Sequence, residues 1–205
     1  MILKELFNWA FICGDWQIAY RKRTKKSDFY EDCFIKIPNT DRYWFADPML
    51  FADNGITYLF VEAFDKKTCK GNIGFFTIQN NKVSDFELLI DNNFHMSYPM
   101  VWRSEQNEYF MIPESEENGT VDLYQSEVFP RRWKRLKTLV AGVHYADTTL
   151  LDLNGKKYLF TYHDKKVSWE LLIYEFDAKS KSVSLIQTLS YDKNVCRSAG
   201  KFFID

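Results

Sequence analysis

The sequence lacks the features that mark metal sites, membrane segments and secreted proteins. Its four cysteines show no C-x-x-C spacing and no clustering with the three histidines, so we expect no zinc site, no other metal and no cofactor. No apolar run approaches the roughly 18 residues that a membrane span needs. The short apolar run at 7–13 is followed by no small-residue cleavage site. We therefore expect free thiols, no membrane span and a cytoplasmic location.

The chain also lacks a charge excess of either sign. Its net charge is −1, which gives no attraction to nucleic acid or to an anionic membrane surface. The two basic stretches, at 21–26 and 131–135, do not alternate with the aromatic platforms that single-strand binders use. We expect no nucleic-acid partner. The chain is instead 46% hydrophobic and 18% aromatic, which predicts a packed core and leaves some aromatic rings for a flat ligand such as a sugar.

What the sequence does contain is one short pattern, repeated three times about fifty residues apart. The copies are Phe-Ala-Asp-Pro-Met-Leu-Phe at 45–51, Met-Ser-Tyr-Pro-Met-Val-Trp at 96–102 and Tyr-Ala-Asp-Thr-Thr-Leu-Leu at 145–151. After each copy come a polar turn and a second apolar strand that opens with Tyr58, Tyr109 or Tyr158. A period of this size, built from short strands, predicts an all-β fold, the β-propeller, with one blade per repeat.

The repeats set the expected domain organisation. They predict blades at about 41–92, 96–141 and 145–191, and the first strand of a fourth blade at 197–203, within a propeller domain at 38–205. Residues 1–37 lie outside the repeat, and their predicted strands at 16–20 and 32–37 are candidates for a ring-closing element. Three blades and one strand would leave apolar sheet faces open. We therefore expect an incomplete ring that a missing C-terminal segment or a partner chain completes.

The repeat also predicts where polar side chains meet. Neighbouring strands of a blade are antiparallel, so the start of the first strand and the end of the second lie at the same rim. This places seven side chains at one mouth, namely Asp47, Glu62, Tyr98, Glu114, Asp147, His163 and Arg197. Crowded carboxylates push each other's pKa values apart, as acid–base chemistry on a glycosidic bond requires. The alternatives are that Asp47 and Asp147 cap turns through backbone N–H groups and that His163 is a structural histidine.

The motifs together resemble a known family. Ala46-Asp47-Pro48, followed by Asp-Asn-Gly and Tyr-Leu-Phe, resembles the five-bladed propellers of glycoside hydrolase families 43 and 32. The wider set resembles more closely the propeller family named after the N-terminal domain of glucosamine inositolphosphorylceramide transferase. That set consists of Phe-Ala-Asp-Pro at 45–48, Val61-Glu62, His-Met-Ser-Tyr-Pro at 95–99, Ile-Pro-Glu-Ser at 112–115, the stretch 118–124, Phe129-Pro130 with Trp133, Ala-Asp-Thr-Thr at 146–149 and Arg-Ser-Ala-Gly at 197–200.

The resemblance implies roles for some residues. The hydrolase pattern makes Asp47 a base or nucleophile, but the second carboxylate position is Tyr98 here and the third is Asp147 in place of glutamate. Glu114 would then donate the proton, while Glu62 and Asp147 tune the site or bind hydroxyls. Substrate contacts are expected from His95, Tyr98, Trp102, His163 and Arg197. In the closer family, transferase chemistry is attributed to a separate C-terminal domain.

Three functions fit these observations. The favoured one is a carbohydrate-active propeller that acts on or binds a glycan or glycoconjugate through a hydrolase-like group of carboxylates. The alternative is a non-catalytic glycan-recognition module associated with a polysaccharide-biosynthesis transferase. A protein-interaction propeller of the kelch kind fits less well, because the Gly-Gly doublets expected of it are absent.

Overall fold

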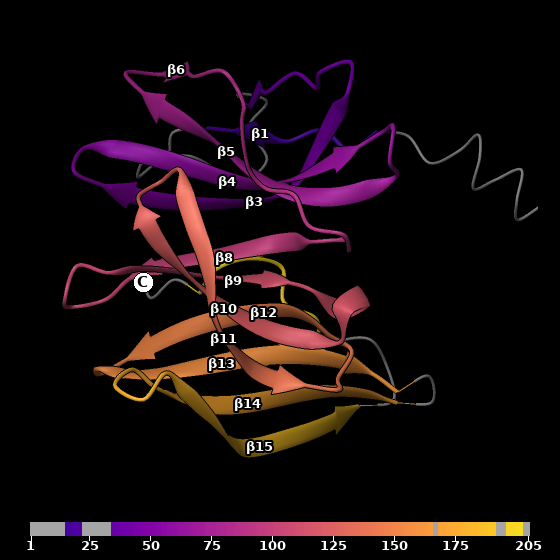
Figure 1. The fold of residues 1–205 in the computed structure, drawn as a ribbon, viewed down its shortest axis with the longest axis vertical. Coiled ribbons are helices and arrows are strands. Elements are labelled where there is room, and N and C mark those ends of the chain that lie inside the picture. Colours follow the sequence, from indigo (N-terminus) through magenta and orange to yellow (C-terminus); the bar gives the residue numbers. More distant parts are fainter. Residues whose placement is uncertain (1–14, 22–33, 166–167, 192–195, 203–205) are drawn as a thin grey trace, which may run out of the picture.

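The computed structural model describes residues 15–21, 34–165, 168–191 and 196–202. Over these residues the protein is all-β, with three antiparallel sheets stacked one on another and a small hairpin at one end (Figure 1). In the two four-stranded sheets every strand pairs with the one that follows it in the chain, as in a propeller blade, whereas the last strand of the five-stranded sheet pairs with the third strand. No helix among the described residues is long and apolar enough to cross a membrane.

The strands of each blade follow the repeat. Blade one contains β3 (Tyr43–Asp53), β4 (Ile56–Asp65), β5 (Lys70–Gln79), β6 (Lys82–Val83) and β7 (Glu87–Ile90). Blade two contains β8 (Ser97–Arg103), β9 (Tyr109–Glu114), β10 (Thr120–Val128) and β11 (Arg132–Ala141), with a 3-10 turn η1 (Glu116–Asn118) before β10. Blade three contains β12 (Tyr145–Leu153), β13 (Lys156–Asp164), β14 (Trp169–Asp177) and β15 (Ser182–Tyr191).

Apolar side chains fill the space between the blades. One core cluster joins blades one and two through Phe60 and Phe75 on one side and Met96 and Met111 on the other. A second joins blades two and three around Trp102. Burial of these large side chains holds the blades face to face, at about 25 cal/mol for each Å² of apolar surface removed from water.

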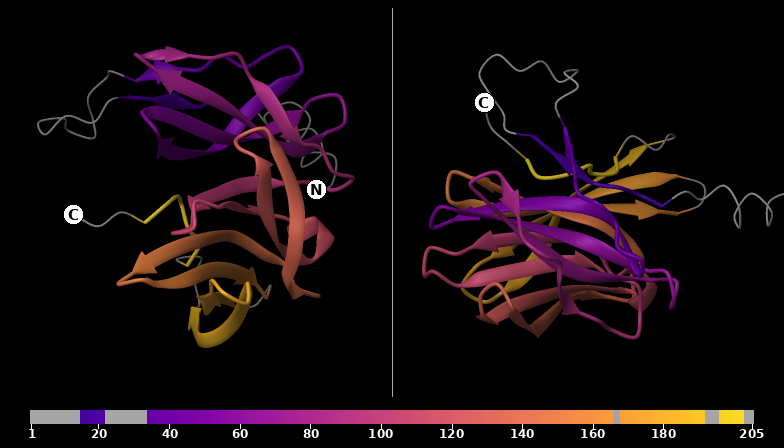
Figure 2. Two further views of the ribbon diagram at one scale, coloured as in Figure 1. Left: turned by 60° about the vertical axis from the view of Figure 1, so that its left-hand side comes forward. Right: turned by 90° about the horizontal axis from the view of Figure 1, so that it is seen from above.

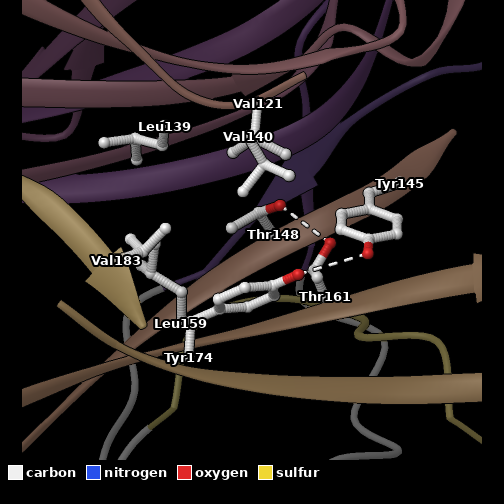
Figure 3. A pocket seen from close by; sticks show the side chains of 9 residues that line it. All are labelled: Val121, Leu139, Val140, Tyr145, Thr148, Leu159, Thr161, Tyr174 and Val183. Atoms are coloured by element: carbon white, nitrogen blue, oxygen red, sulfur yellow. Dashed lines mark hydrogen bonds between the residues drawn. The ribbon is translucent and has the colours of Figure 1, made fainter. Parts of the chain in front are cut away.

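A small gap lies at the interface between blades two and three (Figure 3). Its volume is about 10 Å³, which is room for about one water molecule. Two pairs of polar side chains lie beside it, and the two members of each pair bond to each other. Thr148 Oγ1 donates to Thr161 Oγ1 at 2.9 Å, and the hydroxyls of Tyr145 and Tyr174 are 3.2 Å apart. This gap is therefore too small to hold a ligand.

A short hairpin of β1 (Ala19–Tyr20) and β2 (Ile35–Lys36) lies at the end of the stack that carries blade one (Figures 1 and 2). Ile18 and Ile37 flank it and are buried against Phe45 and Val61 of blade one. These strands are shorter than the ones predicted at 16–20 and 32–37, and residues 32–33 lie outside the described part of the chain.

The predicted fourth inner strand at 197–203 is wrong for its described part, since residues 196–202 form no strand. Hydrogen bonds that involve side chains, from the blades and from the segment itself, hold it in place of a strand ladder. The Tyr98 hydroxyl accepts a hydrogen bond from Gly200 N at 2.9 Å, and Lys201 Nζ donates to the carbonyls of Leu50 and Val101, each at 2.9 Å. The segment thus ties together blades one and two.

Candidate functional site

Each repeat places one residue in the same unusual backbone conformation. Asp47, Tyr98 and Asp147 have φ angles of 48°, 45° and 52°, in the left-handed region that residues other than glycine rarely adopt. In each blade the strand pairing is interrupted at this residue, between 46 and 49, 97 and 100, or 146 and 149. Such bulges re-aim side chains and are common beside active sites. The repeated motif is therefore a bulge at the start of every inner strand.

The strand pairing defines which residues of the second strands are equivalent. The residue before each bulge pairs with Glu62 in blade one, with Glu114 in blade two and with Tyr162 in blade three. The prediction that His163 lies at the mouth is therefore wrong, because the equivalent residue of blade three is Tyr162, one position earlier. His163 pairs with Tyr145, and its Nδ1 lies 3.4 Å from Glu170 Oε2. Because neighbouring residues of a strand point to opposite faces, His163 faces away from the position of Glu62 and Glu114.

A cleft of about 580 Å³ opens beside these bulges. It brings together five of the predicted site residues, from blades one and two and from the C-terminal segment: Asp47, Glu62, His95, Glu114 and Arg197. Its remaining wall includes three aromatic side chains that the repeat analysis did not single out: Trp16, Trp44 and Phe64.

Three carboxyl groups of this cleft titrate abnormally. Burial, with a smaller contribution from nearby Asp47, raises the pKa of Glu62 to about 8. Burial and the neighbouring Asp147 raise the pKa of Glu114 to about 8. The pKa of Asp47 is also raised, first by burial and then by Asp147. At neutral pH both glutamates therefore hold a proton and can donate it or a hydrogen bond.

His95 lies against Glu62 with its tautomer fixed by the backbone. Its Nδ1 accepts a hydrogen bond from Gly71 N at 3.0 Å, so the proton of the neutral ring is on Nε2, which lies 3.3 Å from Glu62 Oε1. Burial lowers the pKa of His95, which favours this neutral form. Gly71 has no substitute here, because a Cβ would lie 2.6 Å from Glu62 Oε1 and 2.6 Å from the Met96 carbonyl oxygen. Sequence reasoning gave no signal for Gly71.

Asp147 is near the cleft, but its carboxylate is already paired with a cation. It is 4% exposed and forms an ion pair with Arg197, whose guanidinium reaches it through Nε. The Asp147 backbone N–H donates to Glu114 Oε2 at 3.0 Å and so holds that carboxyl group in place. Asp147 thus supports its neighbours more than it faces the cleft.

Two residues expected to contact substrate are buried instead. Trp102 is 7% exposed and packs between blades two and three, with its ring 5.6 Å from that of Phe110 and 6.0 Å from that of Phe176. Tyr98 is 4% exposed; its hydroxyl lies 2.7 Å from Thr149 Oγ1, and its backbone N–H donates to Asp47 Oδ2 at 3.2 Å. Neither ring is available to stack on a sugar. Tyr98 instead connects Asp47 of blade one to blade three.

Sequence and structure comparisons agree with this fold. The family profile described as glucosamine inositolphosphorylceramide transferase 1, N-terminal, matches residues 35–187. The protein of that name from Oryza sativa subsp. japonica is 30% identical over 135 residues, which is 63% of this chain and 18% of the relative. The chain thus spans less than a fifth of the length of this relative.

Solved structures of glycoside hydrolases share the architecture. The catalytic domain of a GH62 α-L-arabinofuranosidase from Coprinopsis cinerea aligns with a TM-score of 0.55 at 13% identity, over 71% of this chain and 50% of that one. An exo-β-1,3-galactanase from Phanerochaete chrysosporium aligns with a TM-score of 0.58 at 8% identity, over 78% and 40%. These alignments confirm the predicted five-bladed type of propeller, here with an incomplete set of blades. With the profile match over most of its length, the chain belongs to the family of the N-terminal domain of glucosamine inositolphosphorylceramide transferase 1.

Proposed function

We propose that this domain is a carbohydrate-active propeller that binds a glycan or glycoconjugate in the cleft and cleaves or remodels it. The observation that carries the proposal is the convergence of Asp47, Glu62 and Glu114 on one cleft, each with a raised pKa. Acid–base work on a glycosidic bond needs a protonated carboxyl group beside one that ionises more readily.

Asp47 is the proposed base or nucleophile. Its side chain is half-buried, and the one hydrogen bond to its carboxylate from the described residues is that of Tyr98 N–H. Its remaining oxygen is therefore available to a substrate or to an attacking water molecule. The strained backbone at Asp47 fixes the direction of this carboxylate.

Glu114 is the proposed proton donor. Since Glu114 Oε2 accepts the Asp147 N–H, the proton of the neutral carboxyl group belongs on Oε1. With a pKa of about 8, the group holds that proton at pH 7 until a leaving group takes it. Glu62 and His95 offer a carboxyl O–H and a ring N–H that suit sugar hydroxyls.

A second candidate function is glycan recognition without turnover, in support of a transferase of polysaccharide or glycoconjugate synthesis. Two observations favour it. The equivalent bulge position in blade two holds the neutral Tyr98, and the carboxylate of the third is neutralised by Arg197. The cytoplasmic location expected from the sequence stays a prediction under either function.

The test is a glycan-array and hydrolysis screen on the full chain with the variants Asp47→Asn and Glu114→Gln. Asp85→Asn, at an exposed carboxylate away from the cleft, is the matched control. We expect turnover that falls by about a hundredfold or more in both variants and is unchanged in the control. Binding without turnover in every form would select the recognition function. The absence of both from the wild type would reject the proposal.

A further inference from the structure

Blade one carries an aromatic pair at the rim of the cleft. Trp44 of β3 and Phe64 of β4 are cross-strand neighbours, with ring centroids 4.4 Å apart and ring planes within 9° of parallel. Both side chains are half-buried and both line the cleft. Phe64 follows Glu62 by two residues on the same strand, so the two side chains point to the same face.

This pair is not part of the protein core. Neither ring belongs to the hydrophobic clusters that join blade one to its neighbours, although Phe45 and Tyr43 beside them do. Two large apolar rings are thus kept at the edge of a cleft lined by carboxyl groups. Aromatic rings kept at the rim of a polar cleft are available to contact a ligand there.

The repeat supplies an internal comparison. The residue three positions before each bulge is Trp44 in blade one, His95 in blade two and His144 in blade three. The residues that follow Glu62 and its equivalents by two positions are Phe64, Glu116 and Asp164. Of the three described blades, only the first therefore combines two aromatic rings at this rim.

The polar groups beside the pair have the chemistry of sugar hydroxyl recognition. Glu62, with its pKa of about 8, presents a carboxyl group that both donates and accepts. His95 Nε2–H lies against it, and the His95 ring is 6.3 Å from the Phe64 ring. Apolar rings next to neutral hydrogen-bonding groups match a pyranose, which has one face of C–H groups and an edge of hydroxyls.

The charges beside the cleft favour a neutral sugar. Arg197 is the one cationic side chain among the described residues that line the cleft, and it forms an ion pair with Asp147. The charge of Arg197 is thus already matched, while the acidic side chains of Asp47 in the cleft and of Glu117, which accepts the His95 backbone N–H, disfavour a carboxylate or phosphate ligand. The uncharged state of Glu62 and His95 removes any further attraction for ions.

We propose that Trp44 and Phe64 form a stacking subsite for a neutral pyranose ring, whose hydroxyls bond to Glu62 and His95. The exposed Trp16, whose carbonyl accepts a hydrogen bond from Asn39 Nδ2 at 2.8 Å, lines the same cleft. The inference rests on the proposed function, because it assigns the position of one sugar within the same cleft.

The experiment is calorimetric titration and saturation-transfer NMR on the full chain. The probes are methyl β-galactopyranoside, methyl β-glucopyranoside, β-1,3-galactotriose, cellotriose and, as an anionic sugar, 3′-sialyllactose. The variants are Trp44→Ala, Trp44→Phe, Phe64→Leu and Glu62→Gln. Trp169→Ala is the control, since Trp169 is a half-buried tryptophan of β14 that does not line the cleft. Far-UV circular dichroism and melting curves establish that each variant is folded.

The expected results distinguish a variant that has lost ring stacking from one that has lost its fold. Trp44→Ala should weaken binding of a neutral sugar by about tenfold or more and remove saturation transfer to its ring C–H protons. Trp44→Phe keeps an aromatic face and should bind within about threefold of the wild type, and Trp169→Ala should bind like the wild type. Phe64→Leu and Glu62→Gln should each weaken binding.

Three results would overturn the proposal in distinguishable ways. If the wild type binds a neutral sugar and folded Trp44→Ala binds it equally well with the same epitope, the subsite is wrong and the proposed function stands. If the wild type binds no sugar of the set, the subsite is wrong together with the site on which it rests; binding of the anionic sugar alone would overturn the subsite and leave the proposed function standing.

Discussion

Blades one and three are the same structure with different chemistry. Asp47 and Asp147 lie in equivalent bulges, one hundred residues apart in the sequence, with φ angles of 48° and 52°. Asp47 is half-buried and faces the cleft, whereas Asp147 is buried and paired with Arg197. The residues that pair with the position before each bulge also differ, since Glu62 of blade one is replaced by Tyr162 in blade three.

This difference shows that the repeat determines the backbone conformation at each bulge. The neighbouring side chains determine the pKa and the accessibility of the carboxylate that the bulge carries. The bulge recurs because the strand pairing is interrupted at the same point in every blade. The pKa of Asp47 is raised by burial and by Asp147, and the Tyr98 N–H and the charge of Arg197 offset these effects only in part. The Asp147 carboxylate has its counter-ion beside it. Only blade one of this pair therefore presents a carboxylate to a ligand.

The largest effect should come from Glu62, the residue that blade three lacks. Its pKa of about 8 in the folded state lies above the ordinary 4.5, so the folded chain keeps a proton that the unfolded chain releases. The stability that Glu62 contributes is complete below pH 4.5 and is lost as the pH rises to about 8. Between pH 4.5 and 8 we expect the free energy of unfolding of Glu62→Gln to fall by about 3 kcal/mol less than that of the wild type.

Urea denaturation at a series of pH values between 4.5 and 8 measures this difference. Glu105→Gln is the control, because Glu105 is an exposed glutamate in the turn between β8 and β9. The control curve should run parallel to that of the wild type. A parallel curve for Glu62→Gln as well would mean that Glu62 is ionised in the folded protein, and the contrast with blade three would disappear.

The next largest effect should come from breaking the ion pair of blade three. Arg197→Met leaves the buried Asp147 carboxylate without its partner and makes blade three resemble blade one. Because Arg197 is about half exposed, we expect a loss of about 2 kcal/mol of unfolding free energy at pH 7.

The double variant Arg197→Met with Asp147→Asn tests the cause, since it removes the unpaired charge. It should recover most of the lost stability in a double-mutant cycle. Additive losses in the cycle would contradict an interaction between the two side chains and would assign the effect of Arg197 to packing.

How far the sequence predicts this site depends on the regularity of the repeat. The offsets of 51 and 49 correctly align Asp47, Tyr98 and Asp147, because a bulge at the same strand position gives them the same backbone. The alignment fails at His163 because the first hairpin of blade two is one residue longer. Phe51 faces Tyr58 and Leu151 faces Tyr158, but Trp102 faces Phe110 and not Tyr109.

Other errors come from contacts that no repeat encodes. Tryptophan is a residue type that stacks on sugars, but Trp102 is buried where two blades pack. Only the packing of the sheets on each other reveals this. Trp44 could have been found, since it precedes Asp47 by the same three residues that separate His95 from Tyr98. Arg197 reaches Asp147 from a segment that forms no strand, so its contact depends on tertiary structure alone.

The smallest effect should come from Tyr98, the residue that joins the two blades being compared. Tyr98→Phe removes the hydroxyl that bonds to Thr149 Oγ1 and to Gly200 N, at a cost of about 1 kcal/mol measured by urea denaturation. The backbone N–H that donates to Asp47 remains, so the environment of that carboxylate is kept. The pH dependence of sugar binding should therefore not move while the stability falls. A shifted pH profile would show that the hydroxyl of Tyr98 transmits the charge of blade three to Asp47, and then the two blades would act as one titrating unit.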